Sequence, residues 1–117
     1  MKKRKSYNYG KLSEYIVCVI LFFKGYRILK IRYKTKIGEI DIIAKKGGVL
    51  SFVEVKARAD NSLSEVLSQR QKKRIVNASK YFISNNSKFS NLGLSYDLVV
   101  FNNIFSFKHI KNAWSIE

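Results

Sequence analysis

Three acidic residues that could do chemistry, Glu39, Asp41 and Glu54, lie in two neighbouring apolar segments of a chain that has only 8 acidic residues. A carboxylate inside a hydrophobic strand is costly to desolvate unless a cation or a hydrogen-bond donor pairs with it. A divalent metal ion is the usual partner of two converging carboxylates, and it can promote hydrolysis. These segments therefore predict a metal site with hydrolytic chemistry.

The two apolar segments are predicted to be adjacent strands, at about residues 37–45 and 49–57, with Gly47 and Gly48 between them. Two glycines between apolar runs are typical of a tight two-residue hairpin loop. Such a loop fixes the register of the two strands, and the register decides which side chains meet.

In this register Asp41 faces Glu54 and Glu39 faces Lys56, and side-chain alternation places all four on one face of the sheet. Directly opposed Cβ atoms are ~4.5–5.5 Å apart, so Asp41 and Glu54 repel each other unless a cation lies between them. Mg²⁺ suits such a pair, and the Lys56 ammonium can stabilise a charged transition state beside it. The alternative is an ordinary solvated strand face, which is disfavoured because these strands are predicted to be central.

The remaining pattern predicts one α/β domain at residues 9–117, with the order α-β-β-β-α-β-β. A strand, a crossover helix and another strand imply one parallel pairing in a mixed sheet, with helices on both faces. The second helix is expected to be capped at residues 60–62, and the last two strands to turn at Asn102 and Asn103. The other expected elements are helices at about 9–24 and 63–84 and strands at about 26–34, 96–101 and 104–110.

The net charge is +15, from 23 Lys and Arg against 8 Asp and Glu. Such an excess indicates a polyanionic partner, most often nucleic acid, in preference to an acidic membrane surface or a charge that only maintains solubility. Arg70, Lys73 and Arg74 are neighbours on the expected second helix and are predicted to contact DNA phosphates, with a solvated helix face as the alternative. Arg58 is predicted to contact a phosphate near the site. Residues 1–8 are predicted to be a disordered basic tail that adds nonspecific affinity.

The single cysteine, Cys18, excludes an intrachain disulfide and indicates a reducing, cytoplasmic location. The apolar run at 15–23 is shorter than the ~20 residues that a membrane-spanning helix needs, so it is predicted to be a buried helix, and no membrane partner is expected. His109 has no histidine or cysteine companion for a zinc site and is predicted to be structural. Trp114 is predicted to be a packing residue, with base stacking as the alternative.

Residues beyond the carboxylate pair carry a resemblance to a known family. The motifs are Gly-Glu-Ile-Asp-Ile-Ile at 38–43, Phe-Val-Glu-Val-Lys-Ala-Arg at 52–58, Gln-Lys-Lys-Arg-Ile at 71–75 and Ile-Lys-Asn-Ala-Trp at 110–114. Together they resemble the YraN-like family of largely uncharacterised bacterial proteins. That family lies within the restriction-endonuclease-like, or PD-(D/E)XK, superfamily and is similar to Holliday-junction resolvases.

The resemblance implies a restriction-endonuclease-like core and a set of site residues. Asp41 and Glu54 would bind the metal ion, with the backbone carbonyl of Val55 as a further ligand. Lys56 would be the catalytic lysine. Glu14 would approach the metal from the first helix, either beyond the direct ligands or as a ligand of a second metal ion.

These features predict a nuclease that depends on Mg²⁺ or Mn²⁺ and acts on DNA, including branched or structured DNA. The alternatives are a non-catalytic nucleic-acid-binding protein with the same fold and, with less support, a protein-interaction module. A homodimer is expected by analogy with junction-cutting nucleases. One departure from the family is Ser95, two residues before Asp97, where an arginine is common, so a salt bridge there is placed in doubt.

Overall fold

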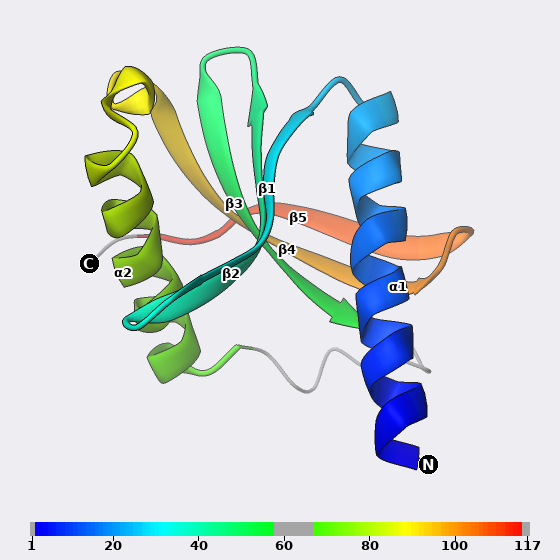
Figure 1. Cartoon of the computed structure of the whole chain (residues 1–117). Coiled ribbons are helices and arrows are strands. Elements are labelled where there is room, and N and C mark those ends of the chain that lie inside the picture. Colours follow the sequence, from blue (N-terminus) through cyan, green and yellow to red (C-terminus); the bar gives the residue numbers. More distant parts are fainter. Residues whose placement is uncertain (1, 58–66, 116–117) are drawn as a thin grey trace.

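The elements of the chain follow the expected order, α-β-β-β-α-β-β, in a computed structural model that describes residues 2–57 and 67–115 (Figure 1). No helix in this part of the chain is long and apolar enough to cross a membrane. The elements are α1 (Lys2–Phe23), β1 (Arg27–Thr35), β2 (Gly38–Lys46), β3 (Val49–Ala57), α2 (Gln69–Ser84), the short 3₁₀ helix η1 (Ser87–Phe89), β4 (Gly93–Asn103) and β5 (Ser106–Trp114).

The strands form one sheet in the order β1-β2-β3-β4-β5. Neighbouring strands are antiparallel except β3 and β4, which are parallel. A parallel pair cannot be joined by a tight hairpin, and α2 lies in the connection between these two strands. The predicted α/β class, mixed sheet and parallel pairing are confirmed.

The β2–β3 hairpin has the register that its two glycines predicted. Lys46 pairs with Val49, and the ladder continues to Ile42 and Val53. Gly47 has a φ of 58°, in the left-handed region that most side chains avoid. This turn fixes which residues of the two strands meet at the far end of the ladder, where the acidic residues lie.

The two helices α1 and α2 cover opposite faces of the sheet, as Figure 1 shows. On one face, Leu21 and Cys18 of α1 are buried in a cluster that includes Ile42 of β2. On the other face, Phe82 of α2 meets Phe52 of β3 edge to face, with ring centroids 6.4 Å apart. The central strands are therefore buried on both sides, so a carboxylate on them is largely removed from water.

The first helix is longer than the sequence predicted. It begins at Lys2, so residues 2–8, which were predicted to be a disordered tail, are helical. The helix ends in a glycine cap. Gly25 has a φ of 97°, and the Tyr26 N–H donates to the Leu21 carbonyl at 3.0 Å.

The second helix begins later than predicted, at Gln69. The Ser68 hydroxyl accepts a hydrogen bond from the Gln71 N–H at 3.1 Å, and the Gln71 side chain accepts one from the Ser68 N–H at 3.5 Å. This reciprocal capping box sets the start of the helix. Leu67, which was predicted to lie on the helix, is buried just before it. The cap predicted at residues 60–62 lies outside the described residues.

The last two strands turn at Ile104 and Phe105, not at Asn102 and Asn103 as predicted. Asn103 ends β4, and its side chain accepts a hydrogen bond from the Phe105 N–H at 2.9 Å. The asparagine therefore stabilises the turn from its first flank, which is a common use of this side chain.

Asp97 is buried on β4, and Ser95 stands two residues before it. Burial acts to raise its pKa, but hydrogen bonds from His109, Ser95 and Asn112 lower it below its usual value. His109 Nε2 lies 2.8 Å from the carboxylate, and both side chains are almost fully buried. Ser95 and His109 thus satisfy the carboxylate of Asp97, and this contact gives His109 the structural role predicted for it.

Candidate metal site

The strands β2 and β3 stop pairing at the open end of their hairpin, far from the turn. Asp41 lies at the point where they separate. The backbone ladder ends at the pair Ile42 and Val53. One residue further, Asp41 Oδ2 accepts a hydrogen bond from the Val55 N–H at 2.8 Å. The Asp41 side chain thus takes the place of the next backbone hydrogen bond between β2 and β3. This contact fixes it in the opening between the two strands.

Glu54 shares this opening with Asp41, as the hairpin register predicted. The two carboxyl groups line a cleft of about 180 Å³ between the strands and α2. The lining residues are Glu39, Asp41 and Glu54 from the strands and Gln71, Arg74 and Ile75 from α2.

The structure pairs Glu39 and Lys56 differently from the prediction. Beyond the opening, β2 continues along β1, so Glu39 lies across from Lys34 and is exposed. Lys56 instead lies beside Glu54, with Nζ and Oε2 3.8 Å apart. The predicted Glu39–Lys56 pair is therefore wrong, and the lysine is directed to the carboxylate pair itself.

The two carboxyl groups cannot both ionise without a large cost. Burial raises the pKa of Glu54, and the charge of Asp41 and a hydrogen bond with it raise that pKa further, to about 9, against the opposing charge of Lys56. Burial also raises the pKa of Asp41, while hydrogen bonds from Val55 and Glu54 and the charges of Lys56 and Arg32 lower it. Near neutral pH the pair therefore holds one proton, which we assign to Glu54.

Glu14 reaches the edge of this site from α1. Its Oε1 accepts a hydrogen bond from Arg32 Nε at 2.8 Å. Burial raises the pKa of Glu14, and the charge of Asp41 adds to this rise, whereas Arg32 opposes it. Glu14 thus lies within electrostatic reach of Asp41, but Arg32 holds its carboxylate. Within residues 2–57 and 67–115, no three His, Cys, Asp or Glu side chains gather closely enough to hold a metal ion on their own.

Arg32 is a site residue that the sequence analysis did not single out. It lies on β1, opposite Asp41 of the neighbouring strand β2, and its side chain donates a hydrogen bond to Glu14. Its φ is 56°, a left-handed value that costs energy in a residue with a side chain and that is concentrated at functional sites. In the sequence it is one of several basic residues in a strand, so only its backbone conformation distinguishes it.

The donor atoms of the carboxylate pair suit a hard divalent cation. Two carboxylates that share one proton offer several oxygen ligands, and a cation can replace that proton. Mg²⁺ usually binds through one or two carboxylates and keeps several waters, so Asp41 and Glu54 are a sufficient anchor. The role of the Val55 backbone carbonyl as a further metal ligand stays a prediction.

Gly38 holds α2 close to this cleft. A Cβ atom at Gly38 would overlap the backbone carbonyl of Arg74, so a glycine is needed for the helix to approach. The Thr35 hydroxyl accepts a hydrogen bond from the Gly38 N–H at 3.0 Å and fixes the turn before β2. This close approach brings Arg74 and Gln71 to the acidic cleft, and Gln71 was not among the predicted site residues.

The predicted DNA-contacting residues fall in different places. Arg74 lines the acidic cleft, whereas Lys73 lines a second cavity beside α2. Arg70 is exposed near the start of α2. Arg58 lies outside the described residues.

Comparison with known proteins identifies the family of this chain. The model of the uncharacterised protein family UPF0102 matches residues 13–101. A UPF0102 protein of Rhizobium johnstonii is 43% identical over 98 residues, which are 83% of this chain and 80% of that protein. One from Ehrlichia ruminantium is 41% identical over 113 residues, 96% of this chain and 88% of that protein. The chain belongs to the UPF0102 family, which is the YraN-like family that its motifs resemble.

Proposed function

We propose that this UPF0102 protein is a nuclease that uses Mg²⁺ or Mn²⁺ to hydrolyse phosphodiester bonds in DNA. The observation that carries this proposal is the pair of Asp41 and Glu54, whose carboxyl groups line one cleft at the opening between β2 and β3. Two buried acids are costly in a purely structural role, and a bound cation removes most of that cost. The ammonium of Lys56 beside the pair supports a hydrolytic role over simple metal storage.

The bound metal ion would polarise the phosphate and activate a water molecule for attack. The residues of the chain would prepare the site for this reaction. The Val55 N–H holds Asp41 in place, and Glu54 releases the shared proton when a cation binds. Lys56 Nζ lies 3.8 Å from Glu54, so it would supply positive charge to a phosphate bound at this pair as negative charge develops on it.

Neighbouring residues would hold the substrate and keep Asp41 ionised. The guanidinium of Arg74 and the amide of Gln71 lie in the wall of the acidic cleft and can contact phosphate oxygens there. Arg32 acts to lower the pKa of Asp41, so it favours the charged form that binds metal. The net charge of +15 attracts the polyanionic substrate.

A nucleic-acid-binding protein without catalysis is the second candidate. The α2 helix has five basic residues and no acidic one, and this alone suffices for binding phosphates. We place either activity in the cytoplasm, where the free Cys18 stays reduced. The basic residues of α2 are Arg70, Lys72, Lys73, Arg74 and Lys80.

The test is cleavage of single-stranded, duplex, flap and four-way DNA in Mg²⁺, Mn²⁺ or EDTA. We expect cleavage of at least one substrate with a metal ion, no cleavage in EDTA, and no cleavage by Asp41→Ala. Lys56→Ala should lower kcat by about 10²–10³-fold, as the loss of one transition-state contact does. The matched control Glu39→Ala removes an exposed carboxylate of the same cleft and should keep most of the activity.

Cleavage that survives in Asp41→Ala would contradict the proposed site. Tight binding of these DNAs without cleavage in any metal ion would favour the second candidate.

A further inference from the structure

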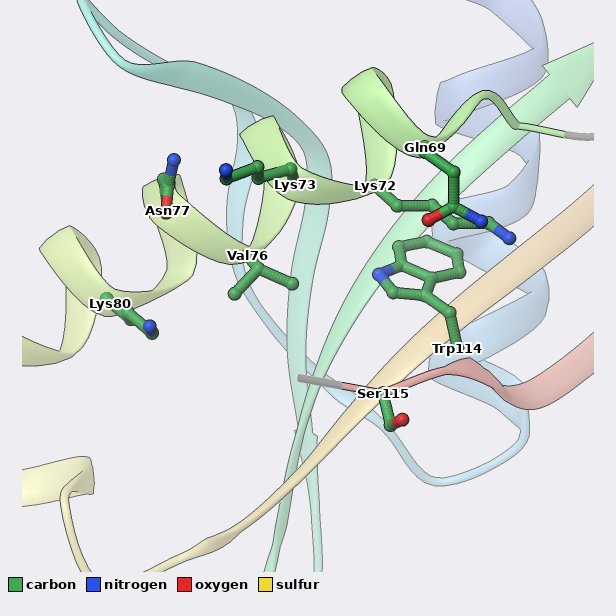
Figure 2. Close-up of a pocket in the computed structure, with 8 residues that line it drawn as sticks. All are labelled: Gln69, Lys72, Lys73, Val76, Asn77, Lys80, Trp114 and Ser115. Atoms are coloured by element: carbon green, nitrogen blue, oxygen red, sulfur yellow. The ribbon is translucent and has the colours of Figure 1, made fainter. Parts of the chain in front are cut away.

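A second cavity lies beside α2, away from the acidic cleft. Its volume is about 500 Å³, and none of its lining residues is acidic. Figure 2 shows the Trp114 indole at the edge of this cavity, beside Gln69 and Lys72 of α2. The lining residues are Gln69, Lys72, Lys73, Val76, Asn77, Lys80, Trp114 and Ser115.

The two cavities flank α2 on either side of its buried stripe. Lys72, Val76 and Lys80 succeed one another at every fourth position and form one row along the helix. Gln71 and Arg74, which line the acidic cleft, lie on the other side of the stripe. The α2 helix is therefore the wall between the carboxylate pair and the lysine cavity.

The aromatic wall of this cavity is fixed in position. The Trp114 ring stacks on the Tyr96 ring with centroids 5.8 Å apart and an angle of 27° between the planes. The Tyr96 hydroxyl is in turn 2.7 Å from the Ser79 hydroxyl of α2. An aromatic ring held in this way loses little entropy when a ligand stacks on it, so the cavity is pre-organised.

We propose that this cavity binds an unpaired nucleotide of a single nucleic-acid strand, an inference that rests on the proposed action on DNA. A base would stack on Trp114, its neighbouring phosphates would contact Lys72, Lys73 and Lys80, and the amides of Gln69 and Asn77 would meet polar groups. The volume falls in the range of about 300–1,000 Å³ that small-ligand sites occupy, so it suits one nucleotide and not a duplex. The strand would continue past α2 towards the acidic cleft.

The test uses Trp114, the only tryptophan of the chain, as its own reporter. The Asp41→Ala protein in EDTA is titrated with a short single-stranded thymidine oligonucleotide while the indole fluorescence is recorded. The anisotropy of a labelled copy of the oligonucleotide gives total binding. We expect saturable quenching that follows the binding curve, because the base stacks on the indole. Binding without quenching would overturn the inference.

A pair of double variants tests the lysines. Lys72→Ala with Lys80→Ala should weaken oligonucleotide binding by about tenfold or more and reduce the slope of log affinity against log salt by about 1–2. Lys108→Ala with Lys111→Ala removes the same charge from exposed positions of β5 outside the cavity, and should have a clearly smaller effect. Equal losses in the two double variants would mean that only overall charge matters, which would overturn the inference.

Two further measurements distinguish the binding of a strand from the binding of a single nucleotide and from the proposed nuclease activity. Thymidine monophosphate should bind far more weakly than the oligonucleotide, and equal affinity would overturn the assignment to a strand. If the wild type cleaves none of the DNA substrates but the oligonucleotide still quenches the Trp114 fluorescence, the nuclease proposal is contradicted and this inference is supported. If the wild type cleaves DNA but the oligonucleotide leaves the Trp114 fluorescence unchanged, the nuclease proposal is supported and this inference is contradicted.

Discussion

Asp41 and Glu54 are both largely removed from water, and the charge of Asp41 adds to the effect of burial in raising the pKa of Glu54. Two residues closer to the hairpin turn, Ile43 and Phe52 form a fully buried apolar pair, which is the usual content of such positions. Replacement of buried ionic groups by apolar ones is often neutral or stabilising, so the carboxylates are not explained by stability. At the scale of single residues, the proposed binding of a cation would account for them.

Glu54→Gln should stabilise the metal-free protein, and increasingly so as the pH rises. The pKa of Glu54 is raised from its ordinary value of 4.5 to about 9 in the folded protein. The folded state therefore keeps a proton that the unfolded state loses, so wild-type stability falls as the pH rises from about 4.5 to about 9. Glutamine has no proton to lose and removes that slope. Urea unfolding should give Glu54→Gln an advantage of ~2 kcal/mol at pH 8 and little at pH 4.

The control for this prediction is Glu39→Gln, which changes an exposed carboxylate of the same cleft. It should leave the pH dependence of unfolding as in the wild type. If the two variants had the same pH dependence, the shared proton of the pair would be ruled out.

At the scale of elements, the site depends on the point where β2 leaves β3. The β2 strand pairs with β1 along its length but with β3 only from Ile42 to Lys46, so the two central strands open around Asp41. The α2 helix closes over this opening because Gly38 lets its backbone approach. The cleft is thus made by one strand separation and one close helix contact.

Gly38→Ala should disturb the cleft through the position of α2. The new Cβ would overlap the Arg74 carbonyl, which is backbone and cannot rotate away. We expect a loss of about 1–3 kcal/mol in the free energy of unfolding, as overpacking causes, and a fall in DNA cleavage because Arg74 moves. Thermal and urea unfolding measure the first effect. Gly48→Ala is the matched control, since a Cβ there meets no atom within 4 Å, and an equal loss in both variants would contradict the account.

The sequence predicted the parts of the fold that local patterns control. The two glycines and the alternating apolar residues fixed the hairpin register, which led to the pairing of Asp41 with Glu54. The start of α2 was misplaced because Ser68 and Gln71 form a capping box inside a polar run that resembles the rest of the helix. In each case the outcome followed from interactions within a few residues.

Features that depend on contacts between residues far apart in the chain were not predicted from the sequence. Glu39 was assigned to Lys56 because the hairpin register was extended past Ile42, where the pairing of β2 with β3 ends. Arg32 was missed since its role comes from contact with Glu14 on another element. Glu14 itself was found only through the family resemblance, because nothing local relates a helix residue to the sheet.

At the scale of the whole molecule, α1 presents an unpaired apolar stripe. Its outer residues repeat at helical spacing, as in helices that pair with another helix. Because such a stripe exceeds what isolated surface residues explain, it supports the expected homodimer through two copies of α1. The exposed apolar residues are Leu12, Tyr15, Val19, Phe22 and Phe23.

Val19→Glu with Phe22→Glu should therefore convert the protein from a dimer to a monomer. Sedimentation velocity over a range of concentrations measures this change. Association of the wild type should strengthen with salt, because the net charge of +15 on each copy causes repulsion that salt screens. Phe105→Glu, at an equally apolar and 92% exposed position of the β4–β5 turn, is the control and should stay dimeric. A wild type that is monomeric at all concentrations would contradict the prediction.

We propose that Asp41 and Glu54 hold a divalent metal ion, and calorimetric titration of Mn²⁺ into the whole chain measures this binding. Titration near neutral pH in buffers of different ionisation enthalpy reports both affinity and proton release. We predict one Mn²⁺ bound with release of about one proton, unchanged binding in Glu39→Gln, and no binding in Asp41→Asn. Unchanged Mn²⁺ affinity in Asp41→Asn, or binding without proton release, would contradict the claim.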